Sequence, residues 1–114
     1  MGDNVLRDSI KNIFADIPLH FTNEWVDNLL QASTLRMERI VSRGHCSPEG
    51  FWYDQDEHEW VVLLKGQAVL RFEAGDETVK MNPGDYLHIE KHCRHRVEWT
   101  DPERETIWLA LHYR

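Results

Sequence analysis

The sequence lacks the features that mark membrane, secreted and nucleic-acid-binding proteins. No apolar run approaches the ~20 residues of a transmembrane helix, and residues 1–8 have no apolar stretch of the kind that a secretory signal contains. With only two cysteines, Cys46 and Cys93, free thiols in a reducing cytoplasm are expected. Thirteen basic residues against 20 acidic ones give a net charge of −7, which disfavours nucleic acid and anionic membrane as partners.

What remains fits one globular domain. The chain has 114 residues, of which 41% are hydrophobic and 29% charged, a balance typical of folded proteins. A chain of this size buries about two-thirds of the surface that its unfolded form exposes, so it can build one core without disulfides. It contains no internal repeat, linker or low-complexity tract.

The first third of the chain favours helix. Residues 4–14 predict a short helix, although residues 13–18 fit an extended arm equally well. Thr22 or Asn23 can cap a second helix that ends near Ala32. This second helix is predicted because apolar residues recur at helical spacing, namely Trp25, Val26, Leu29 and Leu30.

From Leu35 the apolar residues recur with a period of two, which is the period of a β-strand. Short alternating runs follow one another to Tyr113, and turn residues such as Lys65-Gly66 and Asn82-Pro83-Gly84-Asp85 separate them. Such spacing predicts an all-β sandwich or barrel.

Two segments each pair a glycine with a polar residue at a fixed spacing: Glu59 with Gly66, and Gly84 with His95. These spacings resemble the Glu-to-Gly spacing of the first motif and the Gly-to-His spacing of the second motif of the cupin superfamily. The resemblance covers roughly residues 50–100 and is closest to small single-domain bacterial cupins. It implies a double-stranded β-helix, or jelly-roll, barrel over residues 34–114, with residues 1–33 as an N-terminal extension packed on it.

The resemblance also implies a metal site, from which the sequence departs. Glu59 and His95 keep two of the four usual ligand positions. Where cupins have two histidines, this chain has Tyr53 and Gln55, or Trp52 and Asp54 at the longer spacing. One interpretation is a weak site for divalent Zn, Fe, Mn or Ni that Gln55 completes, or His58 if residues 54–57 are irregular. The other is a metal-free hydrogen-bonded cluster of Glu59, Gln55 and His95.

Further residues are expected to line a pocket beside these. Trp52, Tyr53 and Asp54 border it, and His92 lies at its rim. Trp99 follows His95 by four residues, which on a regular strand places both on one face, so Trp99 is expected to close one end of the pocket.

The sequence therefore predicts a small cytoplasmic cupin that binds a small polar molecule inside its barrel. Two functions stay open: a divalent-metal-dependent enzyme, and a non-catalytic binding or sensor module without metal. A homodimer is also expected, because the strand face opposite Glu59 presents Trp60, Val62 and Leu64 and needs a cover. The chain's own extension, a neighbouring barrel or exchanged N-terminal arms could provide it.

Overall fold

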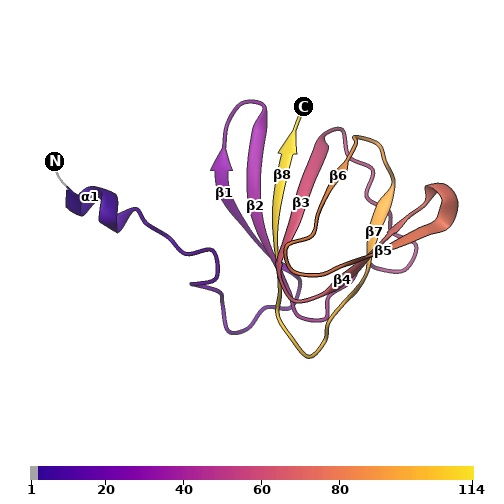
Figure 1. Cartoon of the computed structure of the whole chain (residues 1–114), viewed down its shortest axis with the longest axis horizontal. Helices are drawn as coiled ribbons and strands as arrows, with labels where there is room; N and C mark the ends of the chain where they lie inside the picture. Colours follow the sequence, from indigo (N-terminus) through magenta and orange to yellow (C-terminus); the bar gives the residue numbers. More distant parts are fainter. Residues whose placement is uncertain (1–2) are drawn as a thin grey trace.

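The computed structural model describes residues 3–114, with side chains from residue 6 onward (Figure 1). Over these described residues, one helical turn precedes eight strands. The elements are α1 (Asp3–Asp8), β1 (Trp25–Gln31), β2 (Leu35–Ser42), β3 (His58–Lys65), β4 (Ala68–Phe72), the 3₁₀ turn η1 (Ala74–Asp76), β5 (Glu77–Met81), β6 (Tyr86–Ile89), β7 (His95–Thr100) and β8 (Thr106–Tyr113). Within the described residues, no helix has the length and apolar character needed to span a membrane.

The strands form two antiparallel sheets that face each other as a jelly-roll barrel (Figure 1). The larger sheet has the order β1-β2-β8-β3-β6 and the smaller one β5-β4-β7. Strands far apart in the chain are neighbours: β8 lies between β2 and β3 and pairs with both. The all-β jelly-roll fold expected from the sequence is confirmed.

The helix expected at residues 22–32 is wrong. Residues Trp25–Gln31 form β1, an edge strand paired with β2. The register shifts between Asn28 and Leu30, which leaves Leu29 as an extra bulge residue. A bulge changes which side chains share a face, so a bulged strand can imitate helical spacing. The boundary expected at residue 33 falls within the β1–β2 hairpin, and the barrel sheet therefore starts at Trp25.

The segment before β1 is an extended arm held by two arginines of β2 and the loop after it. Arg39, 6% exposed, donates to the backbone carbonyls of Ile13, Ala15 and Asp16. Arg43 donates to the carbonyls of Leu19 and Pro18. Five carbonyl groups of the arm thus accept hydrogen bonds from guanidinium donors in place of secondary structure.

Two glycines of the recognised motifs have a backbone role. Gly66 follows β3 with φ 86°, and a Cβ there would lie 2.4 Å from Thr106 Oγ1 and 2.7 Å from Glu105 O, so a side chain is excluded. Gly84 also has a positive φ, 93°. Its N–H donates to Leu63 O, which ties the turn before β6 to β3.

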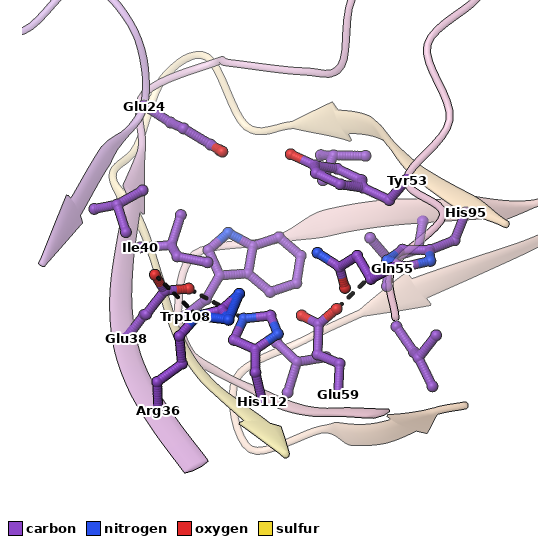
Figure 2. Close-up of a pocket in the computed structure, with 15 residues that line it drawn as sticks. Glu24, Arg36, Glu38, Ile40, Tyr53, Gln55, Glu59, His95, Trp108 and His112 are labelled. Carbon is purple, nitrogen blue, oxygen red and sulfur yellow. Dashed lines mark ion pairs between the residues drawn. The ribbon is translucent and has the colours of Figure 1, made fainter. Parts of the chain in front are cut away.

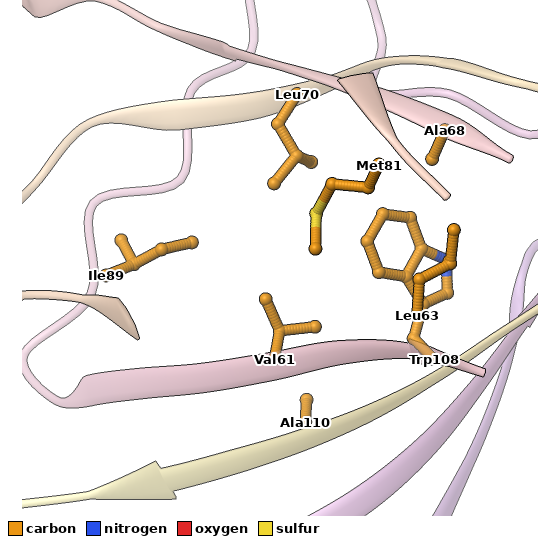
Figure 3. Packing of buried hydrophobic residues seen from close by; sticks show 8 residues of the cluster. All are labelled: Val61, Leu63, Ala68, Leu70, Met81, Ile89, Trp108 and Ala110. Carbon is orange, nitrogen blue, oxygen red and sulfur yellow. The ribbon is translucent and has the colours of Figure 1, made fainter. Parts of the chain in front are cut away.

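The barrel interior has an apolar end and a polar end. Along β3 the inward residues are Glu59, Val61 and Leu63, and along β8 they are His112, Ala110 and Trp108. The apolar end is a close-packed cluster (Figure 3), formed by Val61, Leu63, Ala68, Leu70, Met81, Ile89, Trp108 and Ala110. Glu59 and His112 are cross-strand partners at the other end.

Candidate functional site

A cavity of about 220 Å³ occupies the polar end (Figure 2). Both sheets and the segment before β3 contribute to it. Of the residues expected at the site, Glu59, His95, Gln55 and Tyr53 line it. The rest of the lining is Glu24, Val26, Arg36, Glu38, Ile40, Val61, Leu70, Ile89, Val97, Trp108 and His112.

Glu59 and His95 meet across the two sheets. His95 Nε2 lies 3.5 Å from Glu59 Oε1, and His95 Nδ1 lies 2.8 Å from the Cys93 carbonyl oxygen. Burial alone would lower the pKa of His95, but the Glu59 carboxylate and the Cys93 carbonyl outweigh it and raise that pKa. Both ring nitrogens face oxygen acceptors, so the protonated imidazolium is the form that suits this pair.

Tyr53 positions His95. The two residues form an isolated backbone bridge with N–H to O distances of 2.7 and 3.2 Å. The Tyr53 ring stacks on the His95 imidazole at 5.4 Å, and Phe72 stacks on the same imidazole at 6.0 Å. Burial, followed by the nearby charges of Glu24 and Glu59, raises the pKa of Tyr53 to about 12. Its hydroxyl is therefore protonated at neutral pH.

A second polar pair lies on the floor of the cavity. His112 Nε2 is 3.0 Å from Glu38 Oε1, and Arg36 Nε is 3.8 Å from Glu38 Oε2. Figure 2 shows the His112 ring between Glu38 and Glu59. The sequence interpretation missed both members of this pair. Strand alternation could have found them, because Glu38 shares its parity with Ile40 and His112 shares its parity with Trp108.

Three expected site residues lie elsewhere. His58 lies on the outer face, where its ring contacts His88 at 5.8 Å and Tyr113 at 5.2 Å, so it does not complete a ligand set with Glu59. Trp52 lies outside the cavity, with the Arg71 guanidinium 6.0 Å from its ring. Trp99 is 37% exposed, because a register shift in β7 between Val97 and Trp99 turns it outward.

Asp54 and His92 form an exposed pair near the cavity without lining it. His92 Nδ1 lies 2.8 Å from Asp54 Oδ1, and His92 Nε2 lies 3.4 Å from Asp56. The hydrogen bond with Asp54 raises the pKa of His92, and the same bond lowers the pKa of Asp54. The His92 N–H donates to the Gln55 carbonyl, so this pair braces the segment that carries Gln55.

Among the described residues, the His, Cys, Asp and Glu side chains do not by themselves supply a full ligand set for a metal ion; Gln55, the third ligand expected from the sequence, lines the cavity with Glu59 and His95. Glu59 and His95 are the two donors that approach each other, whereas protein zinc sites use at least three protein ligands. Among the described residues, no three His, Cys, Asp or Glu side chains converge on one point. Cys46 and Cys93 are both free thiols, as expected, and neither lines the cavity.

Fold and site together define a small jelly-roll barrel with a polar cavity at one end. Comparison with known proteins gives the family: residues 40–112 match the cupin domain family, and the chain belongs to it. No curated protein matches the chain significantly.

Solved structures support the same assignment. A Ralstonia eutropha JMP134 protein, described as a candidate mannose-6-phosphate isomerase, is 45% identical, with a TM-score of 0.87 over 92% of this chain and 97% of that one. A cupin superfamily protein of Desulfitobacterium hafniense DCB-2 is 16% identical, with a TM-score of 0.69 over 85% and 83% of the two chains. The polyketide cyclase RemF of Streptomyces resistomycificus is also 16% identical, with a TM-score of 0.66 over 77% and 63%. The last two share the fold alone.

Proposed function

We propose that this cupin binds a small polar molecule in the cavity at the polar end of its barrel. The observation that carries the proposal is the combination of one partly open cavity, an aromatic and aliphatic wall, and two His–Glu pairs on its surface. Such a combination is typical of ligand sites, where a few placed polar groups orient a ligand within an apolar pocket. A water molecule takes up about 30 Å³ in the liquid. The cavity volume of about 220 Å³ is several times larger and suits a ligand of about monosaccharide size.

The ligand is bound without a metal ion. Glu59 has an imidazole partner within the protein, so its buried charge does not require a cation. Metal analysis of untagged protein tests this point. We expect sub-stoichiometric zinc, iron, manganese and nickel, and a melting temperature that a chelator leaves unchanged. One equivalent of any of these metals would favour the metal-dependent enzyme instead.

A cavity-filling variant tests the ligand proposal. Ile40 lines the cavity from β2 and is half-buried, so Ile40→Trp is expected to fill the space. Extraction and mass spectrometry of purified wild-type protein should find a co-purifying small molecule that Ile40→Trp lacks. Leu64→Trp, on the outer side of β3, is the matched control and should retain the molecule. Equal occupancy in wild type and Ile40→Trp would contradict the proposal.

We also propose that the protein acts as a homodimer. The arm before β1 carries exposed apolar residues, including Leu6 at 71%, Ile10 at 77% and Leu19 at 83% exposure. Half-buried apolar side chains cover the outer face of the larger sheet, namely Trp60, Val62, Leu64, Leu109 and Leu111. A second copy of the chain supplies an apolar cover for both.

Light scattering at micromolar concentration tests the dimer. We expect a mass of about 27 kDa, twice the 13.6 kDa of one chain. Deletion of residues 1–20 should weaken association if the arms are exchanged and leave it intact if the barrels meet directly. A monomer at this concentration would contradict the dimer.

A further inference from the structure

The cavity is rich in carboxylates. Glu24, Glu38 and Glu59 all line it, and among the described lining residues Arg36 is the only arginine or lysine. Arg36 is already engaged, because its Nη1 lies 2.5 Å from Glu57 Oε1 and its Nε lies 3.8 Å from Glu38 Oε2. Even with His95 counted as an imidazolium, three carboxylates face two cationic groups, so the lining holds more negative than positive charge.

This charge balance opposes an anionic ligand. Proteins recognise phosphate and carboxylate groups with unpaired arginine or lysine side chains, or with convergent backbone N–H groups. Here a phosphate dianion would lie among carboxylates with no free guanidinium to receive it. Burial is the main cause that raises the pKa of Glu24; His45 and Ser42 oppose it, and the charge of Glu38 adds the smallest contribution.

His112 indicates which ligand groups the cavity can bind. The side chain is 4% exposed, and its Nε2 faces Glu38 Oε1 at 3.0 Å. An ionised carboxylate only accepts hydrogen bonds, so in the neutral imidazole the proton belongs on Nε2 and Nδ1 carries the lone pair. Within the part of the chain that the structure describes, Nδ1 has no hydrogen-bond partner. A buried acceptor without a donor is costly, and a ligand that donates a hydrogen bond removes the cost.

We propose that the cavity selects ligands that donate hydrogen bonds and carry no negative charge, with the Glu38–His112 pair as the acceptor for a ligand hydroxyl or ammonium group. This inference rests on the proposed function and names the ligand class for the same site. Glu38 holds the proton on the far nitrogen of His112, and Glu59 offers a second acceptor beside the ring (Figure 2). A neutral sugar or an amino sugar meets these requirements, whereas a sugar phosphate does not.

A matched set of probes tests the charge selectivity. D-mannose, D-mannosamine and D-mannose 6-phosphate are titrated at millimolar concentrations into ¹⁵N-labelled full-length protein, and NMR shifts of cavity residues report binding. We expect the phosphate ester to bind about tenfold more weakly than the other two, because like charges repel in the cavity. Glu24→Gln should reduce the difference in affinity between the phosphate ester and the other two sugars, because it removes one carboxylate from the lining. A phosphate ester that binds as tightly as mannose would overturn the inference and leave the cavity as a ligand site.

Variants of His112 test the acceptor. Asn places an amide oxygen near the position of Nδ1, whereas Gln reaches Glu38 and leaves no acceptor at that position. We expect His112→Asn to keep most of the affinity for mannose and His112→Gln to lose about tenfold, which corresponds to about 1.4 kcal/mol. His88→Gln, on the outer face, is the control and should bind as wild type does.

Two further experiments test the protonation of the His112 ring and provide a substitute for a variant that does not fold. The ¹⁵N spectrum of the His112 ring should show a protonated Nε2 and an unprotonated Nδ1 in wild type. If His112→Gln does not fold, Glu38→Gln replaces it, because this variant removes the charge that fixes the proton without a change in size. The opposite tautomer, equal mannose affinity in all variants, or no shift from any probe would overturn the inference. If wild-type protein holds no co-purifying molecule that Ile40→Trp lacks, the proposed function is contradicted independently of this inference.

Discussion

The two ends of the barrel interior use the same strands for opposite purposes. On β3, Leu63 is fully buried at the apolar end, and Glu59, four residues away on the same face, lies in the cavity. On β8, Ala110 belongs to the core and His112 to the cavity floor. Strand alternation decides which residues point inward, while position along the strand decides whether they meet packed side chains or open space.

The difference shows how stability and binding are separated in so small a domain. The apolar end removes side chains from water and leaves them no polar group to satisfy. The polar end instead places Glu59, His95, Glu38 and His112 in two pairs, each with a carboxylate beside an imidazole. Buried pairs of this kind contribute little net stability, because desolvation offsets their attraction. Changes at the two ends should therefore affect different measurements.

The largest expected effect is at the apolar end. Leu63 is 0% exposed, so Leu63→Ala should lower the free energy of unfolding by about 2–5 kcal/mol through lost burial and a residual cavity. Ligand binding in the folded fraction should remain unchanged. Urea unfolding monitored by tryptophan fluorescence measures the first quantity, and Leu30→Ala on β1, where Leu30 is 50% exposed, is the control. An equal loss from both variants would remove the distinction between the core and the exposed surface.

A smaller effect, dependent on pH, is expected at the polar end. Since Glu59 raises the folded-state pKa of His95, their pair stabilises the fold fully below the unfolded value of about 6.5 and loses this contribution as pH rises through the folded pKa. Glu59→Gln should therefore cost about 1–2 kcal/mol near pH 5.5 and little or nothing near pH 8.5. Thermal or urea unfolding across this range measures the change. A cost that is the same at both pH values would mean that His95 is not the partner that titrates.

Sequence patterns predicted the barrel well because most of its strands are regular. Runs with a period of two and Gly–Pro turn residues located β2 to β8, and the motif spacing placed Glu59 and His95 together. The errors at β1 and at Trp99 both involve a bulge. At β1 the extra residue Leu29 contributes to an apparent helical spacing, and in β7 the bulge shifts the strand alternation on which the Trp99 prediction depended. The Glu38–His112 pair was missed because the two residues are 74 positions apart and meet only through the pairing of β2 with β8.

The smallest expected effect is outside the barrel interior, at the exposed His92–Asp54 pair. His92 has a left-handed φ of 63°, which Asn tolerates better than most residues, so His92→Asn removes the imidazole with little backbone strain. The hydrogen bond with Asp54 raises the pKa of His92 in the folded state, so the pair contributes below the unfolded pKa and loses this contribution as pH rises through the folded value. His92→Asn should thus lower the melting temperature slightly at pH 5.5 and leave it unchanged at pH 8.5.

A second measurement on the same variant separates rim from cavity. The His92 N–H holds the Gln55 carbonyl through the backbone, and this contact survives the substitution. Ligand affinity should therefore stay at the wild-type value, in contrast to the loss expected for His112→Gln. Because both partners are exposed, salt should weaken the pH 5.5 difference, whereas the pH dependence that Glu59 and His95 produce in the interior should persist. A salt-insensitive effect at His92, or a loss of ligand affinity there, would mean that the rim pair belongs to the cavity after all.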